Sequence, residues 1–474
     1  MSEITRVLAV PAVGAYYYTD LAALQASPIP VADQYTASPV APGFRAVREV
    51  AEAVSVGLVL SDKRVVWGEC VGVAYSGKAG RDPVFRTADG LSAIHRKVTP
   101  ALEGREITSF REMAAEIDAL TQATRIPTPL GSESTDSEES HSRGLSRREL
   151  LTAPLRLFHD GDSGAAASEA RQTARTGQHV TEERPLHTAV RYGVSQALLK
   201  AVALTRGVTM AEVIAEEWDL PRPDRPVPIH AQSGGERRQN ADKMIVRRVT
   251  SLPHALVEDI PQQLGEDGEQ LVSYVRWLTK RILKLGGPEY RPDIHLDVHG
   301  ALGRIYENNL GRVLGYLYRL ESSVQPYTLR VESPVVMETR GAQIETLRTL
   351  REYVQFRDMA VQIVADEWAN TLEDIRAFVQ AQAVDMIQIK MPDLGGVHNS
   401  VDAAMACKEG GVGAFLGGSC AETDLSARVA VHVALATQPD MIMAKPGMGV
   451  DEGISIVQNE MARTLAQIKM LEGH

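Results

Sequence analysis

Cysteine is scarce in this chain of 474 residues, which contains only Cys70, Cys407 and Cys420. The three positions are odd in number and far apart, and none has the C-x-x-C spacing that is typical of zinc and redox motifs. The sequence therefore indicates neither a disulfide framework nor a zinc site, and a reducing compartment is the default expectation.

Long apolar runs and a targeting segment are missing as well. No run of about 18 apolar residues occurs, which is the length that a membrane-spanning helix needs. The N-terminal segment MSEITRVLAVPAVGAYYY lacks the charged-then-apolar plan of a signal peptide. We therefore expect a cytoplasmic protein without membrane partners.

The chain has no surplus of positive charge either. It contains 61 acidic and 50 basic residues, and its net charge is -11. Nucleic-acid binding relies on a basic surface, so we expect no nucleic-acid partner. An acidic balance does not exclude an anionic small molecule as substrate, because a metal ion and a few lysines can set the sign of one pocket.

Length and composition are those of a globular protein with two domains. The hydrophobic content of 44% and the charged content of 23% lie near the globular average. We expect residues 1–225 to form an α+β domain and residues 226–474 to form a barrel. In the first domain, SVGLVL and VVWGECVGV predict a β-hairpin, and residues 109–123 predict a helix that Ser109 caps.

Residues from about 127 to 184 differ from the rest of this domain in composition. TPLGSESTDSEESHSRG and DGDSGAAASEARQTARTG are rich in Ser, Gly, acidic residues and Arg. They predict an inserted surface loop or a disordered segment, with a short helix at SRRELLTAPLRLF. A tolerated insertion is favoured over a partner-docking arm. Helical patterns resume at LHTAVRYGVSQALLKAVALTRG and TMAEVIAEEW.

From Pro226 onward, short apolar runs alternate with amphipathic helical patterns such as GEQLVSYVRWLTKRILKL and TLEDIRAFVQAQ. The runs are PVPIHAQS, IVRRVTSLPHAL, DIHLDVHG, YTLRVESP, VQIVADEW, MIQIKMPD, GAFLGGSC and MIMAKPG. Strands with crossover helices in this number predict a parallel (β/α)8 barrel of TIM type. An open doubly wound sheet is the alternative, but no strand is followed by a G-x-G-x-x-G turn.

Three acidic residues stand at the ends of successive predicted strands. Asp297 ends IHLDV, Glu332 ends YTLRV, and Asp366 follows VQIVA. Unpaired carboxylates would be costly beside these apolar runs, so we expect positive charge among them. Each acid alone could pair with a lysine or arginine. Three oxygen ligands on consecutive strands, without a His or Cys set, favour Mg2+ over Zn2+.

The next predicted strand carries Gln388 and Lys390, which are two residues apart and therefore point to the same face. Beside a metal ion and inside the barrel, the ammonium form of Lys390 is disfavoured. We expect its pKa to fall and the side chain to act as a general base. A solvated lysine at a strand end is the alternative.

Histidines offer further proton-transfer groups. His254, in SLPHAL, ends the second predicted strand, across the barrel from the sixth. It could serve the opposite face of a substrate, although a lone histidine is more often structural. His295 and His299 share the face of Asp297, and we interpret them as neighbours of the metal ligands or as core residues.

Amide, hydroxyl and thiol side chains follow other strands. Gln232, Gln388, Ser419 and Cys420 lie where the first, sixth and seventh predicted strands end. With nearby backbone N–H groups, such side chains suit carboxylate recognition. A nucleophilic role for Cys420 is disfavoured because no base is identifiable beside it.

At these residues the chain resembles the 3-methylaspartate ammonia-lyase family of the enolase superfamily. The matching stretches are collinear and cover the chain outside the insert. They are GRDPVF, REITSF, LHTAVRYG, TMAEVI, QSG with NADKMI, LPHAL, YVRWL, HLDVHG, VADEW, QIKMPDLGGVHN, GGSCAET and AKPGMGVDEG.

The resemblance implies a barrel with an N-terminal capping domain, a homodimer, and elimination of ammonia from 3-methylaspartate to give mesaconate through an enediolate. It implies Mg2+ ligation by Asp297, Glu332 and Asp366, with Lys390 as the base at C3 and His254 on the opposite face. It also implies that substrate is contacted by Gln232, Gln388, Ser419, Cys420, Ala74 and Met443.

Some positions depart from the family pattern. Ala74 stands where relatives usually carry Gln in a lid loop, Ser419 replaces Thr, and Met443 replaces Leu. Gly235 and Glu236 replace a pair of aspartates. None is a metal or base position, so the expected reaction class is unchanged. The departures leave open an N-substituted or differently 3-substituted aspartate as substrate.

Two other functions remain as alternatives. Enolase-type racemases and cycloisomerases use a K-x-K pair on the second strand, where this chain has LPHAL. A non-catalytic barrel is disfavoured because the three acids and Lys390 are all present.

Overall fold

The computed structural model describes residues 2–27, 29–127, 179–447 and 449–472. The chain forms two compact units: Met1–Leu120 together with Leu186–His474, and Thr121–Pro185. No helix within the described ranges combines the length and apolar character needed to cross a membrane.

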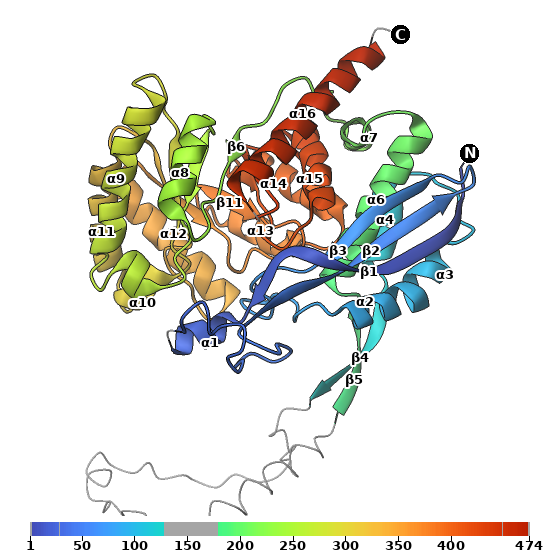
Figure 1. Ribbon diagram of the computed structural model, residues 1–474, viewed down its shortest axis with the longest axis horizontal. Coiled ribbons are helices and arrows are strands. Elements are labelled where there is room, and N and C mark those ends of the chain that lie inside the picture. Colours follow the sequence, from blue (N-terminus) through green and yellow to red (C-terminus); the bar gives the residue numbers. More distant parts are fainter. Residues whose placement is uncertain (1, 28, 128–178, 448, 473–474) are drawn as a thin grey trace, which may run out of the picture. The chain divides into compact units, whose positions relative to one another are not determined.

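The N-terminal part of the larger unit is built on an antiparallel sheet (Figure 1). Its strands are β1 (Ile4–Thr19), β2 (Arg48–Leu60) and β3 (Val65–Val71). The pairing of β2 with β3 confirms the predicted hairpin. Helix α6 (Thr188–Arg206) packs closely on β3, because a Cβ at Gly68 would lie 1.9 Å from the Gly193 carbonyl oxygen.

Short helices surround this sheet. They are α1 (Leu21–Ala26), α2 (Thr87–Ala93), the π-helix η1 (Ile94–Val98), α3 (Thr99–Leu102), α4 (Phe110–Asp118) and α7 (Met210–Glu217). Ser109 caps α4 as predicted, since its Oγ accepts from the Glu112 N–H at 3.3 Å. The predicted extent of that helix, to residue 123, is wrong, because the chain enters strand β4 (Thr121–Pro127).

The smaller unit contains an antiparallel pair formed by β4 and β5 (His179–Pro185). The prediction of an irregular segment over residues 127–184 is therefore wrong at its C-terminal end, where residues 179–184 lie in a strand. Composition did not reveal this strand because β-pairing depends on a cross-strand partner. The helix predicted at SRRELLTAPLRLF lies outside the described residues.

The C-terminal part is a closed parallel barrel, which confirms the predicted fold and excludes an open sheet. Pairing of β13 with β6 closes the ring. The strands are β6 (Ile229–His230), β7 (Ser251–His254), β8 (Asp293–Asp297), β9 (Leu329–Glu332), β10 (Val361–Ala365), β11 (Met386–Ile389), β12 (Gly413–Leu416) and β13 (Met441–Met443).

Helices connect the strands on the outside of the barrel (Figure 1). The predicted second strand is shorter than expected, because residues 245–246 belong to helix α8 and the strand begins at Ser251. The helices are α8 (Arg237–Val246), η3 (Ile260–Leu264), α9 (Glu269–Gly286), α10 (Ala301–Ile305), α11 (Leu310–Val324), α12 (Arg340–Phe356), α13 (Leu372–Gln380), α14 (Val397–Glu409), α15 (Asp424–Thr437) and α16 (Val450–Glu472).

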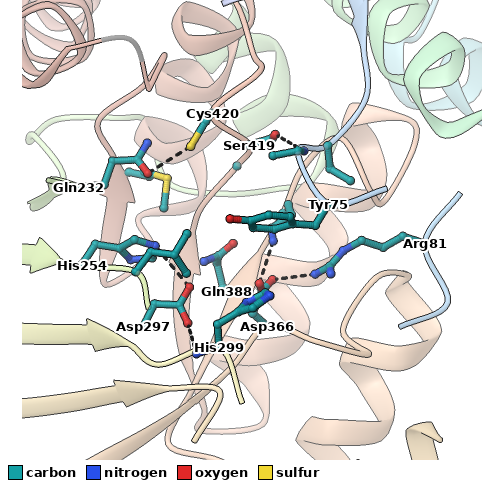
Figure 2. Close-up of a pocket in the computed structure, with 16 residues that line it drawn as sticks. Tyr75, Arg81, Gln232, His254, Asp297, His299, Asp366, Gln388, Ser419 and Cys420 are labelled. Atoms are coloured by element: carbon teal, nitrogen blue, oxygen red, sulfur yellow. Dashed lines mark hydrogen bonds and ion pairs between the residues drawn. The ribbon is translucent and has the colours of Figure 1, made fainter. Parts of the chain in front are cut away.

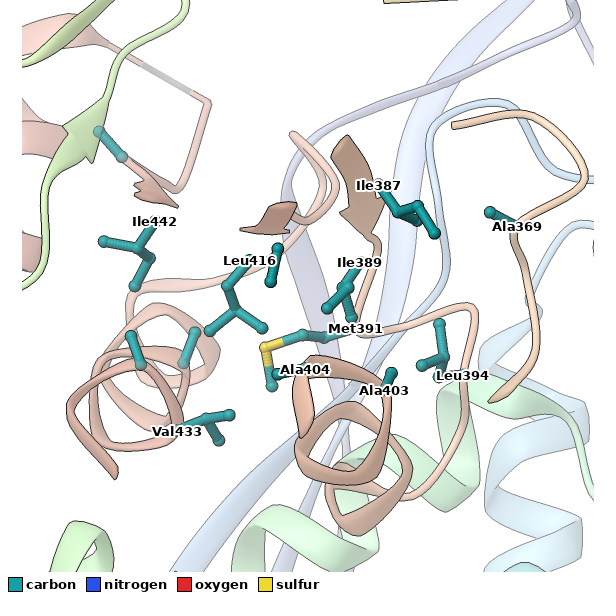
Figure 3. Close-up of a cluster of buried hydrophobic side chains, with 14 of the residues drawn as sticks. Ala369, Ile387, Ile389, Met391, Leu394, Ala403, Ala404, Leu416, Val433 and Ile442 are labelled. Atoms are coloured by element: carbon teal, nitrogen blue, oxygen red, sulfur yellow. The ribbon is translucent and has the colours of Figure 1, made fainter. Parts of the chain in front are cut away.

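Alternation along the strands separates two apolar layers. Ile387 and Ile389 of β11 lie in the core that includes Ala404 of α14 (Figure 3). Met386 belongs instead to a separate cluster that is formed by Val364, Met386, Phe415, Met441 and Met443. Since successive side chains of a strand point to opposite faces, Gln388 shares the side of Met386, and this alternation aims it into the barrel.

Candidate active site

A pocket lies where the barrel strands end and where residues 73–81 of the N-terminal part cover them (Figure 2). All predicted site residues except Glu332 line this pocket. They are Ala74, Gln232, His254, Asp297, Asp366, Gln388, Lys390, Ser419, Cys420 and Met443. The structure therefore brings together residues that are spread over most of the sequence.

The three acids stand at the ends of neighbouring strands. Asp297 ends β8, Glu332 ends β9, and Asp366 follows β10. Their exposed fractions are 4%, 0% and 4%, respectively. Burial raises the pKa of Asp297 to about 7, with help from Glu367 and Asp366. Burial also raises the pKa of Glu332 well above its ordinary value, and Asp297 and Asp366 add to it.

The pKa values of Asp297 and Glu332 are raised because burial disfavours their charged forms and neighbouring carboxylates repel them, and the charge of Lys390 offsets this only in part. Oxygen atoms of Asp297 and Glu332 lie within 4.8 Å of one another and of a His254 nitrogen. Asp366 does not belong to this group, and its carboxylate contacts Lys390 and Arg81. The two carboxylates of the group offer hard oxygen donors, which suit a divalent cation of the Mg2+ type.

Side chains around Glu332 and Asp297 fix how these acids point. Gln388 Nε2 donates to Glu332 Oε1 at 2.6 Å, and His295 Nε2 lies 2.7 Å from Glu332 Oε2. The backbone N–H of His299 donates to Asp297 Oδ1 at 2.9 Å. His295 and His299 are thus direct neighbours of the acids, as the sequence interpretation held.

The His299 ring forms a charged pair with Glu367 that the sequence did not reveal. Its Nδ1 lies 3.0 Å from Glu367 Oε1, and both side chains are buried. Burial lowers the pKa of His299, but the carboxylates of Glu367, Asp297 and Asp366 outweigh it and raise the pKa to about 9. The ring is therefore positively charged at neutral pH and partly balances the acids.

Lys390 follows β11 and faces Asp366, whose Oδ2 accepts from Lys390 Nζ at 2.7 Å. The predicted fall in the pKa of Lys390, which presupposes a metal ion beside it, stays a prediction. Burial and Arg81 lower that pKa, but the carboxylates of Asp366, Asp393 and Glu367 outweigh them and raise it. The expectation counted a metal ion but not the carboxylate in direct contact.

Arg81 comes from the covering loop and is a site residue that the sequence analysis missed. Its Nη2 donates to Asp366 Oδ1 at 3.2 Å and its Nε donates to Asp393 Oδ2 at 2.8 Å. The side chain is 1% exposed. Its only signal in the sequence is the GRDP stretch, which carries no periodic pattern. Arg81 ties the loop to Asp366 (Figure 2), the same acid that accepts from Lys390.

His254 ends β7, which is separated from β11 by three strands in each direction around the barrel. This order places it across the pocket from Lys390. Its φ of 65° lies in the left-handed region, which is uncommon for a residue with a side chain and clusters at functional sites. Nε2 lies 3.5 Å from Asp297 Oδ2. Burial, then Lys390, lowers the pKa of His254 to about 3, so the ring is neutral.

Polar groups of the remaining strands form the other wall. Cys420 Sγ donates to Gln232 Oε1 at 3.4 Å. Burial raises the pKa of Cys420 to about 11, which agrees with a thiol rather than a nucleophilic thiolate. Among the described residues, Gln232 Nε2 and Gln388 Oε1 are buried without a hydrogen-bond partner. Such groups are suited to bind a polar ligand.

The covering loop contacts the barrel through two more of its residues, one by its backbone and one by its side chain. The N–H of Ala74 donates to Ser419 Oγ at 3.0 Å. Tyr75 lies in the pocket wall, and its hydroxyl donates to Glu258 Oε1 at 2.5 Å. Nothing in the sequence singled out Tyr75, because a loop tyrosine has no spacing to read.

A fully buried ion pair supports the loop that carries Ser419. Lys445 Nζ donates to both carboxylate oxygens of Glu422 at 3.0 Å. Glu422 also accepts from the Ser419 N–H at 2.8 Å and from the Tyr192 hydroxyl at 2.6 Å. The network joins α6 to the ends of β12 and β13, and it was not predicted.

Comparison with known proteins gives matches over the whole length. The family model described as methylaspartate ammonia-lyase C-terminus matches residues 222–470, and the one described as methylaspartate ammonia-lyase N-terminus matches residues 2–131 and 160–219. Methylaspartate ammonia-lyase 2 of Carboxydothermus hydrogenoformans is 41% identical and covers 99% of this chain and 100% of the relative. Methylaspartate ammonia-lyase of Clostridium tetanomorphum is 39% identical, covering 98% and 99%.

Solved structures agree. Beta-methylaspartase from Clostridium tetanomorphum, as an Mg-complex, has a TM-score of 0.79 at 38% identity and 99% coverage of both chains. Methylaspartate ammonia lyase from Citrobacter amalonaticus, containing (2S,3S)-3-methylaspartic acid, has a TM-score of 0.82 at 37% identity, covering 98% and 100%. Muconate lactonizing enzyme from Pseudomonas fluorescens, 14% identical with a TM-score of 0.55 and coverage of 96% and 89%, shares the fold.

Replacing Arg81 should destabilise the protein strongly. Arg81→Met leaves the carboxylates of Asp366 and Asp393 buried without the guanidinium, and breaking a buried pair in this way costs about 3–5 kcal/mol. Arg105→Met is the matched control, because its ion pair with Glu116 is 43% and 57% exposed, and exposed pairs contribute about 0–1 kcal/mol. Urea unfolding should show a lower midpoint for Arg81→Met only. Equal midpoints for the two variants would show that the buried ion pairs of Arg81 do not stabilise the fold.

Proposed function

Because the chain belongs to the methylaspartate ammonia-lyase family and is a carbon–nitrogen lyase, we propose that it eliminates ammonia from 3-methylaspartate to give mesaconate. One observation carries this proposal. Lys390 and His254 lie on opposite sides of a pocket that is lined by the buried Asp297 and Asp366, and the buried Glu332 lies beside Asp297 on the neighbouring strand. Elimination requires a proton-transfer group that faces one substrate carbon beside a cation site, and two such groups on opposite faces would serve both C3 epimers.

Asp297, Glu332 and Asp366 would hold Mg2+, since the oxygen donors of all three and the raised pKa values of Asp297 and Glu332 fit that ion. When bound, Mg2+ supplies positive charge beside the substrate carboxylate, where negative charge accumulates as the C3 proton leaves. His299, charged through its contact with Glu367, adds a fixed positive charge from the protein itself.

Lys390 is the base that takes the proton from C3 of the (2S,3S) epimer. Burial and Arg81 both disfavour its ammonium form, and the contact with Asp366 opposes them. Lys390 therefore loses its proton more readily once the charge of Asp366 is neutralised. Deprotonation gives an enediolate, and the electron pair then forms the C2=C3 double bond while the C–N pair departs with the amine.

The buried amides and the Ser419 loop orient the substrate. Gln232 Nε2 lacks a partner among the described residues and can donate to a carboxylate oxygen. Cys420 and Ser419 complete that wall together with Gln388. Arg81 and Tyr75 close the pocket from above through Asp393 and Glu258 and so exclude water.

A related lyase reaction on an N-substituted or differently 3-substituted aspartate is the second candidate. Ala74 and Met443 line the pocket, at positions where the family pattern has Gln and Leu. A methyl group at residue 74 leaves more room, and makes fewer hydrogen bonds, than an amide side chain. We propose that this wall faces the amine of the substrate.

Several sequence expectations stay proposals. We propose that residues 1–225 cap the pocket and that residues 226–474 form the catalytic barrel. We also propose a homodimer located in the cytoplasm, which light scattering of the purified protein and cell fractionation would test.

Removing Lys390 should abolish turnover of one epimer. Lys390→Ala should lower mesaconate formation from (2S,3S)-3-methylaspartate by roughly 100- to 10,000-fold, the usual contribution of a general base. His254→Ala is the matched variant and should act mainly on the (2S,3R) epimer. Ultraviolet absorbance of mesaconate, with and without EDTA, measures both rates.

Unchanged melting temperatures and Mg2+ binding would establish that both variants are folded. Retained (2S,3S) turnover in Lys390→Ala would remove the lysine from its role.

Ala74 should admit larger amines. The wild-type protein should add methylamine to mesaconate more readily, relative to ammonia, than Ala74→Gln does. One methyl group in a pocket typically changes such a ratio by roughly 10- to 200-fold. Lys78→Gln is the control, because it lies in the same loop outside the pocket. If the ratio is the same in all three proteins, Ala74 does not face the amine.

A further inference from the structure

A chain of hydrogen bonds runs from the start of β7 to His254 through a buried histidine. Ser251 Oγ lies 2.9 Å from His230 Nδ1. His230 Nε2 lies 3.3 Å from His254 Nδ1. His230 belongs to β6, is 0% exposed and does not line the pocket. Among the described residues, the hydrogen bond that links the His230 ring toward the pocket is the one with His254.

The surroundings of His230 keep this ring neutral and fixed. Its centroid lies 4.6 Å from the His295 ring and 5.1 Å from the Phe415 ring. Burial, assisted by His254 and Arg330, lowers the pKa of His230 well below its ordinary value. A neutral imidazole has one N–H donor and one acceptor nitrogen, so His230 can either donate to His254 or accept from it.

The direction of that hydrogen bond decides what His254 offers to the substrate. If His230 Nε2 accepts, the proton of His254 sits on Nδ1, and Nε2 presents a lone pair on the pocket side. If His230 donates, His254 carries its proton on Nε2 and cannot act as a base there. His254 Nε2 lies 3.5 Å from Asp297 Oδ2 (Figure 2), while Nδ1, the nitrogen that contacts His230, lies 4.0 Å from Glu332 Oε2.

We propose that His230 is a positioning residue that accepts the Nδ1–H of His254, so that His254 Nε2 faces the substrate as a base. The inference rests on the proposed function, and it assigns a role to a residue that touches no substrate. In the step itself, the C3–H bond of the (2S,3R) epimer breaks and an N–H bond forms at Nε2. The electron pair forms the C2=C3 double bond, and the C–N pair leaves with the amine.

After this step His254 is an imidazolium that still donates from Nδ1 to His230 Nε2. A ring nitrogen held by a hydrogen bond at its far side keeps its orientation and gains basicity, as outer partners of functional histidines do. The left-handed φ of His254 gives a second reason for the support, because a strained backbone needs contacts that hold its side chain in place.

The test compares both epimers in His230→Leu and His230→Gln. His230→Leu removes the acceptor, so kcat for the (2S,3R) epimer should fall roughly 10- to 100-fold, the usual loss on removing such a partner. Its KM should change little, and kcat for the (2S,3S) epimer should stay within about threefold, because Lys390 carries that reaction. His230→Gln offers an amide oxygen as acceptor and should restore part of the (2S,3R) rate.

Ser251→Ala extends the test with a smaller change, at the residue that contacts the far side of the His230 ring. It loosens His230 without removing it, so it should lower (2S,3R) turnover in the same selective way but by a smaller factor. If His230→Leu does not fold, a selective loss of (2S,3R) turnover in Ser251→Ala tests the inference in its place. Exchange of the C3 hydrogen of the (2S,3R) epimer with deuterated water should fall in parallel with turnover.

Equal losses for the two epimers would show that His230 only fills the core and would overturn the inference. No loss for either epimer, or a wild-type protein that processes the (2S,3S) epimer alone, would overturn it as well. A wild-type protein that is inactive on both epimers would instead reject the proposed function, and this inference with it.

Discussion

Crowding of buried carboxylates at one end of the barrel is the constraint on which the rest of the site depends. Asp297, Glu332 and Asp366 come from three neighbouring strands and are almost inaccessible to solvent. Burying such charges without compensation is costly, so some of the groups around them have to donate hydrogen bonds or positive charge. The Gln388 amide, the charged His299 and the Lys390 ammonium do so. The negative charge that they leave unbalanced defines a site for a cation.

The same constraint explains why a residue of the N-terminal part completes the site in the barrel. Arg81 reaches from one to the other to contact Asp366, so an acid of the barrel is completed by a cation from the covering loop. Ser419, itself held by Glu422, accepts a hydrogen bond from that loop. The pocket wall, Lys390 and the acids therefore form one connected structure, and changes in the loop at Ala74 alter the pocket without touching the acids.

The sequence predicted those parts of the structure that depend on local patterns of residues. The strand-and-helix rhythm predicted the barrel, and alternation on β11 correctly placed Gln388 and Lys390 on the inner side. It missed Arg81 and His230, because each acts through partners that are distant in the chain. The direct contact of Lys390 with Asp366, which raises the pKa of the lysine, could not be predicted from spacing either.

The central claim is that these acids form a binding site for a divalent cation. Its most direct test is calorimetric titration of the protein with Mg2+ near pH 7 in two buffers of different ionisation enthalpy. Since burial raises the pKa of Asp297 to about 7 and that of Glu332 well above its ordinary value, binding should release about one proton or more per site. Asp366→Asn should weaken the binding. Absence of Mg2+ binding, or binding without proton release, would contradict the account.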